Sequence, residues 1–184
     1  MGFLSNIFGQ KQNEKPTSDL AFYEEVVDSI AFSDTLKDDL KARLKLAFED
    51  PKSFYDDNNE FILSERGLTY PKDALLTPKF VLIDTLQNNG EMAEVDWKEE
   101  EIEVRIVLNE IRMAKNYEFT LSNDELYNGH DTGEILQLIN EKELKIQGYS
   151  IEFLDINSDS YIFTIITLGD KQVVKMMFEK LHGY

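Results

Sequence analysis

The chain has 184 residues and no cysteine, and its 36 aspartates and glutamates against 19 lysines and arginines give a formal net charge of −17. The absence of thiols excludes disulfides, cysteine catalysis and cysteine-ligated metal centres. The negative charge disfavours binding to nucleic acids and anionic membranes, since both are bound through basic patches. Because 42% of the residues are hydrophobic, we expect the chain to fold. The absence of cysteine fits the reducing cytoplasm, where we expect the protein to lie.

Residues 1–18 are predicted to form an amphipathic, flexible tail ahead of a single domain, 19–184. The apolar residues of the tail share one helical face: Phe3, Leu4, Ile7 and Phe8. Their run is too short for a membrane span, and Asn6 stands where a myristoylation signal needs Ser or Thr. The tail therefore docks peripherally on a membrane or partner, packs on its own domain, or is a frayed terminus.

Helical spacing of apolar residues dominates the first half of the chain. Ser33 or Asp34 can cap the second helix, and Pro78 follows Thr77 at the start of the fourth. The predicted helices cover residues 19–30, 36–48, 54–65 and 78–86.

A strand is predicted after Gly90, over residues 92–97, because apolar and acidic residues alternate there. This alternation places Trp97 on the buried face and Asp96 on the outer face. Residues 99–115 fit both a strand and a helix. We favour the helix, because the glutamates at its start are stabilised by the positive end of a helix dipole.

The second half combines a loop, a helix and a hairpin. Residues 116–130 are predicted to be a loop, and the capping box from Asp131 to Glu134 opens a helix that ends near Gly148. Strands are then expected at 149–156 and 160–168, before a final helix. The predicted fold is α+β, with a helical N-terminal half packed on a small, mainly antiparallel sheet with flanking helices.

No catalytic, metal or cofactor site is predicted. The segment from Asp155 to Ser160 begins like a calcium loop, but Ser160 replaces the required Gly and Ile166 the bidentate Glu, so a hairpin turn fits better. His130 lies beside Asp131 and near Glu134, which a general base or metal ligand would need, yet no second histidine stands at ligand spacing.

The densest acidic stretch is 91–103, where seven acids against Lys98 give a net charge of −6. An acidic outer face of this kind suits a basic protein partner. Together with two acids of the 55–60 segment, it supplies the predicted partner-binding residues: Glu94, Asp96, Glu99, Glu100, Glu101, Glu103, Asp56 and Asp57.

The run "LIDTLQNNGEMAEVDWKEEEIEVRIVLNEI", with its D-W-K-E junction, resembles an uncharacterised family of small bacterial domains. The resemblance implies no activity and no site residues, since that family has none assigned. The acidic, cysteine-free, α+β character is also similar to that of immunity proteins encoded beside toxins.

Two functions remain open from the sequence. The first is a non-enzymatic protein that binds a partner through its acidic surface, as an immunity protein or antitoxin does. The alternative is an enzyme that uses carboxylates and His130, with a divalent metal.

Overall fold

A computed structural model of the chain describes residues 20–55 and 63–182. The predicted tail 1–18 lies outside the described residues, as do Asp56 and Asp57 of the predicted partner-binding set. In the part of the chain that is described, no helix is long and apolar enough to cross a membrane.

Three antiparallel strands form the sheet, in the order β1-β3-β2. They are β1 (Ala93–Asp96), β2 (Tyr149–Phe153) and β3 (Ser160–Thr167). The register places Phe163 of β3 opposite both Ala93 of β1 and Phe153 of β2. The predicted hairpin and the predicted first strand are thus confirmed, although both β1 and β2 end earlier than expected.

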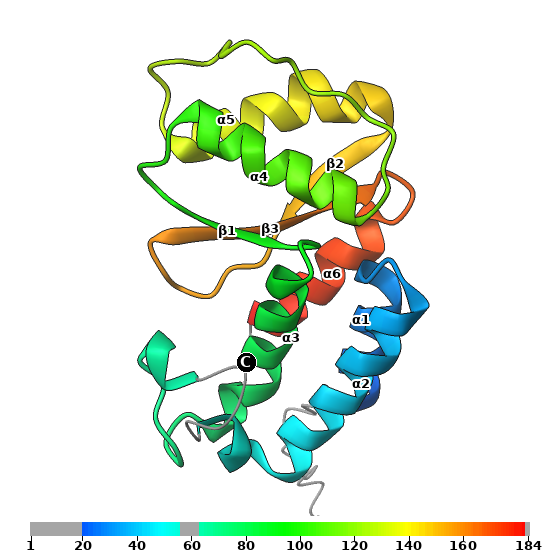
Figure 1. Cartoon of the computed structure of the whole chain (residues 1–184), viewed down its shortest axis with the longest axis vertical. Helices are drawn as coiled ribbons and strands as arrows, with labels where there is room; N and C mark the ends of the chain where they lie inside the picture. Colours follow the sequence, from blue (N-terminus) through cyan, green and yellow to red (C-terminus); the bar gives the residue numbers. More distant parts are fainter. Residues whose placement is uncertain (1–19, 56–62, 183–184) are drawn as a thin grey trace, which may run out of the picture.

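Helices cover both faces of this sheet (Figure 1). One face carries α4 (Glu101–Ala114) and α5 (Thr132–Ile139). The other faces a helical layer made of α1 (Leu20–Ile30), α2 (Asp34–Glu49), α3 (Thr77–Asn88) and α6 (Lys171–His182). The α+β class is confirmed, with a sheet enclosed between two helical layers.

Strand β3 separates two hydrophobic cores. Phe163 and Ile165 pack into the core beneath α4 and α5, whereas Ile162 and Ile166 pack into the core of the other layer. Successive side chains of a strand point to opposite faces, so a central strand must be apolar on both. This explains the run of β-branched and aromatic residues from 161 to 166.

Local capping follows the sequence closely. Ser33 accepts a hydrogen bond from the N–H of Leu36 (3.2 Å), and Asp131 accepts one from the N–H of Glu134 (2.8 Å). After α5 the chain passes through a π turn, Asn140–Leu144, and a 3-10 turn, Lys145–Gln147, and ends in the left-handed conformation at Gly148 (φ 90°).

The helix predicted over residues 54–65 is wrong in its described parts. The chain forms a 3-10 helix at Pro51–Tyr55 and another at Leu63–Arg66, followed by a third at Ala74–Leu76. Pro51 lacks the N–H that a continuation of α2 would require, so a 3-10 helix follows α2. The preference for a helix over residues 99–115 is confirmed by α4.

A buried lysine joins the two layers. Lys115, directly after α4, is 1% exposed, and its Nζ donates to the carbonyl oxygens of Ile30 (2.7 Å) and Ile165 (3.2 Å). Nearby, the carboxylate of buried Glu91 accepts from the N–H of Phe32 (2.8 Å). Burial lowers the pKa of Lys115 to about 8 and raises the pKa of Glu91 above its usual value.

The lowered pKa of Lys115 predicts how stability changes with pH. Between about 8 and 10.5 the unfolded lysine still holds its proton while the native one has lost it, so stability rises with pH. The neutral amine keeps two N–H donors for its two carbonyl partners. From about pH 8 to about pH 10 the free energy of unfolding of the wild type, relative to Lys115→Met, should rise by about 1–3 kcal/mol in urea denaturation.

Lys45→Met is the control, because Lys45 is exposed beside Glu49 at 4.0 Å. Its stability relative to the wild type should stay constant over the same pH range within about 0.5 kcal/mol. A Lys115→Met difference that is also independent of pH would contradict the assignment.

Candidate functional site

Trp97 is exposed, which corrects the prediction that its ring is buried. Strand β1 ends at Asp96, and Trp97 lies in the following turn with 47% of its surface accessible. The Asp96 carboxylate accepts from the N–H of Lys98 (2.9 Å), an Asx turn that ends the strand. Because alternation stops at Asp96, nothing directs the Trp97 ring inward.

The turn that carries Trp97 is anchored to the body of the protein. The N–H of Glu99 donates to the Asp96 carbonyl (3.2 Å), and buried Thr132, at the start of α5, donates its hydroxyl to the Glu99 carbonyl (3.0 Å). Trp97 is therefore presented by a turn with hydrogen bonds at both ends.

Exposed apolar side chains continue beyond Trp97. Ile102 (40% exposed) and Ile106 (46%) lie one turn apart on the outer face of α4. Leu126 is exposed on the loop that covers the start of α4, where its N–H donates to the Glu101 carboxylate (2.9 Å). Ile102 and Ile106 thus share one exposed face of α4, and exposed apolar faces occur at interaction sites.

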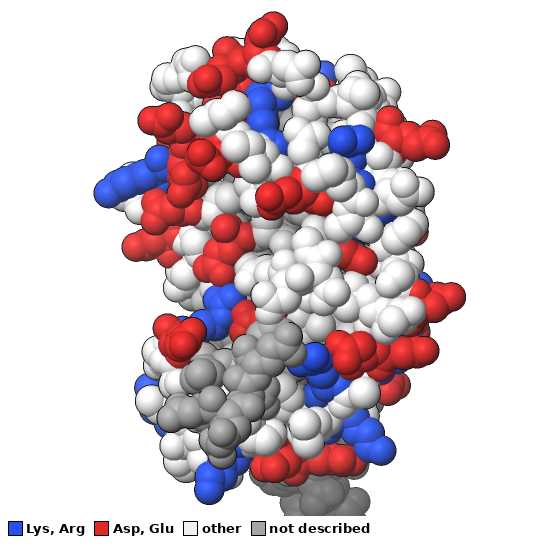
Figure 2. All heavy atoms as spheres, in the orientation of Figure 1, with Lys and Arg blue, Asp and Glu red and all other residues white. Residues whose placement is uncertain are grey.

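Four carboxylates lie in the same β1–α4 segment as Trp97 and Ile102. Asp96, Glu100 and Glu103 are exposed, and Glu99 is half-buried. Figure 2 shows red carboxylate atoms gathered along the left side of the upper half, where Figure 1 places the β1–α4 connection and the start of α4. We call the whole set the Trp97 surface: Trp97, Ile102, Ile106, Leu126, Asp96, Glu99, Glu100 and Glu103.

Glu101 is absent from this surface, contrary to the prediction that its carboxylate faces a partner. It is 1% exposed, and its carboxylate accepts from the N–H groups of Leu126 (2.9 Å) and Tyr127 (2.6 Å) and from Arg105 Nε (2.8 Å). Because these bonds satisfy a buried charge, Glu101 is a structural residue that holds the 115–131 loop on α4.

Arg105 extends the same buried network. It is 4% exposed, and its guanidinium donates to Glu143 (2.9 and 3.2 Å) and to the Ser122 carbonyl (3.1 Å). Burial opposes ionisation of Glu143, but the bonds from Arg105 and the Ser122 N–H hold the pKa of Glu143 below its usual value. The network therefore pins the long loop at both Ser122 and Tyr127.

Glu94 belongs to another network, below the sheet. Its carboxylate accepts from Ser160 Oγ (2.6 Å), from Arg66 (3.1 Å) and from Gln87 (3.3 Å), and Arg66 also pairs with Asp84 (2.5 Å). Burial opposes ionisation, yet the bonds from Ser160 and Arg66 lower the pKa of Glu94. Glu94 thus links β1 to β3 and to η2 (Leu63–Arg66), on the same face of the strand as Asp96.

His130 pairs with Glu134, the neighbour that the sequence placed near it. It is exposed, and its Nδ1 lies 2.9 Å from the carboxylate of Glu134, one helical turn away. Among the described residues no group of three or more His, Asp or Glu could hold a metal ion. The segment from Asp155 to Ser160 forms the β2–β3 turn, with Asn157 at φ 59°.

Sequence reasoning missed two features for which signals existed. Asp96 stands two residues before Lys98, the spacing of an Asx turn, and this would have ended the strand before Trp97. Glu101 and Arg105 stand four residues apart, the spacing of a helical ion pair. Their burial depends on the 115–131 loop, which no periodicity places.

The profile of one protein family, a domain of unknown function named DUF6630, matches residues 23–182. The chain belongs to DUF6630. The expected membership of an uncharacterised domain family is thereby confirmed. No curated protein and no solved structure matches the chain.

The structural role of Glu101 in this DUF6630 domain can be tested beside that of its exposed neighbour. Glu101→Gln removes a buried charge bound by two main-chain N–H groups, so we expect a loss of about 1–3 kcal/mol of unfolding free energy. Amide hydrogen exchange at Leu126 and Tyr127 should become faster. Glu103→Gln, on the exposed face, should change stability by less than about 0.5 kcal/mol and leave both amides protected. Equal behaviour of the two variants would contradict the assignment.

Proposed function

We propose that this DUF6630 protein is a non-enzymatic, cytoplasmic protein that binds a basic protein partner through the Trp97 surface. The observation that supports the proposal best is the exposure of Trp97, on an anchored turn, beside outward-facing carboxylates. An apolar centre with a charged rim is the usual composition of a protein–protein interface.

The apolar centre would supply most of the affinity. Tryptophan is among the residues whose truncation costs most at interfaces, because a large rigid ring loses little entropy on binding. Ile102 and Ile106 extend the contact along α4 and Leu126 extends it onto the loop. Hydrogen bonds at both ends of the Trp97 turn reduce the ordering cost of association.

The carboxylate rim points to a cationic partner. Lys98 Nζ already lies 4.3 Å from the centre of the Trp97 ring, a cation–π contact within the chain. A lysine or arginine of a partner can take the same place and can also pair with Glu100 or Glu103. The net charge of −17 would speed the approach of a basic protein.

The specific form of this proposal is an immunity or antitoxin-like role, in which the partner is a basic growth-inhibiting protein. Acidity, small size and the absence of cysteine support it, together with the Trp97 surface. Production of the chain should then restore the growth of cells that produce such a partner, and Trp97→Ala should remove the protection.

The prediction for the surface itself concerns affinity and rate. With a captured partner, Trp97→Ala should weaken binding by about 30-fold, and Glu100→Lys with Glu103→Lys should slow association about tenfold at low salt. Raising the salt from about 50 mM to about 500 mM should weaken wild-type binding strongly, since exposed charges are screened. Surface plasmon resonance on the full chain measures all three effects.

Two variants elsewhere on the surface serve as controls. Leu75→Ala removes an apolar side chain that is 81% exposed, and Glu25→Lys with Asp38→Lys changes the net charge by the same amount as the test pair. Neither should alter affinity, and the distant charge pair should slow association far less than Glu100→Lys with Glu103→Lys. Partner binding that resists both salt and Trp97→Ala would refute the proposal.

A further inference from the structure

The outer edge of β2 is open at its C-terminal end. In the described chain β3 lies between β1 and β2, and no strand pairs with the other edge of β2. Leu168 donates its N–H to the Gly148 carbonyl (2.8 Å) and Leu154 donates to Ile162 (2.9 Å), so even-numbered residues of β2 pair with β3. The N–H and C=O groups of Ile151 and Phe153 therefore point to the open side.

Asn140 occupies only part of this edge. Its Oδ1 accepts from the N–H of Ile151 (2.9 Å), and the residue is 8% exposed. Its Nδ2 carries two donors and forms no hydrogen bond with the described residues, while Asn140 lines the cleft beside the edge. A side-chain amide whose Nδ2 lies at a cleft can donate to a carbonyl oxygen that enters it.

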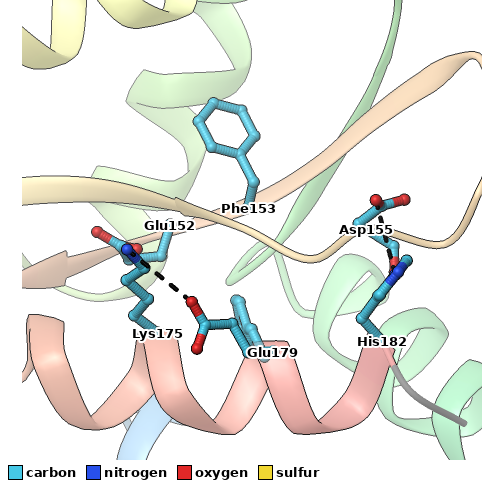
Figure 3. Close-up of a pocket in the computed structure, with 7 residues that line it drawn as sticks. Glu152, Phe153, Asp155, Lys175, Glu179 and His182 are labelled. Atoms are coloured by element: carbon cyan, nitrogen blue, oxygen red, sulfur yellow. Dashed lines mark hydrogen bonds and ion pairs between the residues drawn. The ribbon is translucent and has the colours of Figure 1, made fainter.

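Two clefts meet at Phe153. One, of about 470 Å³, lies between β2 and α6, and the other, of about 460 Å³, lies between α5 and the end of the β2–β3 hairpin. Phe153 and Asp155 line both. Figure 3 shows the Phe153 ring projecting from β2 away from α6, whereas Glu152 and Glu179 lie on the α6 side.

The two clefts differ in charge. The α6 side contains three carboxylates. Buried Glu152 is paired with Lys171 (3.0 Å), whereas Asp155 and Glu179 are exposed, 3.6 Å from His182 and 3.9 Å from Lys175. Among its lining residues the α5 side offers the aromatic rings of Phe153 and Tyr161, whose centres are 6.2 Å apart. The alternating side chains of an added strand would enter one cleft each, with a cation suited to the first and an apolar group to the second.

We propose that this edge binds an extended basic peptide, which adds a strand to β2 with its lysines or arginines toward α6 and its apolar side chains toward α5. The peptide main chain pairs with the N–H and C=O of Phe153. Asn140 Nδ2 supplies a further donor at the position where the Ile151 N–H is already bonded. This site lies on the opposite edge of the sheet from β1, so it stands or falls independently of the Trp97 surface.

The test titrates the full chain with a short synthetic peptide of alternating lysine and valine, acetylated and amidated at its ends. In two-dimensional NMR we expect shifts of the Phe153 main-chain amide and the Asn140 side-chain amide, with a dissociation constant on the order of 100 μM. A peptide that is N-methylated at alternate residues, so that it loses strand donors, should bind at least about tenfold more weakly.

A matched pair of charge reversals tests the orientation. Glu179 lies 3.9 Å from Lys175 and Glu49 lies 4.0 Å from Lys45, in exposed pairs of the same helical spacing. Glu179→Lys should weaken the alternating peptide about fivefold or more, while Glu49→Lys should leave its affinity unchanged.

Four results would overturn the proposal. Equal binding of the N-methylated peptide, or equal effects of the two reversals, would indicate attraction to the acidic surface in general. Shifts confined to the Trp97 surface would place the peptide elsewhere. A dimer in sedimentation velocity that Phe153→Lys abolishes would show that a second copy of the chain fills the edge.

Discussion

The bond from Lys115 to two carbonyl oxygens is the constraint on which the arrangement of the layers depends. Its Nζ reaches the end of α1 and the middle of β3, so the helical layer, the sheet and the end of α4 share one buried point. Ile165 has no β1 partner on that side, since β1 begins only at Ala93, and the lysine satisfies the carbonyl that the short strand leaves open. The two hydrophobic cores, one on each face of the sheet, are therefore held in a fixed position relative to Lys115.

Much of the fold follows from local chemistry. Helices α1 to α4, the capping box at Asp131 and the hairpin are predictable because caps, turns and apolar spacing act within a few residues. The helix predicted over 54–65 fails in its described parts, where the chain forms two separate 3-10 helices. The enclosure of the sheet between two layers could not be predicted, because it depends on which helix packs on which face.

In the candidate site, too, local features could be predicted from the sequence, whereas features that depend on packing could not. Alternation placed Asp96 outside correctly, but the side chain of Asp96 also ends the strand, and this exposes Trp97. Composition assigned Glu101 to the surface together with its neighbours. Its burial arises from a loop that returns to α4 more than twenty residues later in the chain, and charge density alone cannot distinguish a solvated carboxylate from one that holds a loop.

The π turn after α5 has a consequence for how this segment tolerates change. A π turn contains one residue more than a regular helical turn, and this one begins at Asn140, whose side chain is bonded to the edge of β2. Deleting one residue between 141 and 144 would restore α-helical winding and remove the wide turn from which Asn140 reaches the Ile151 N–H. Chains with this fold should therefore vary in the composition of this segment and keep its length.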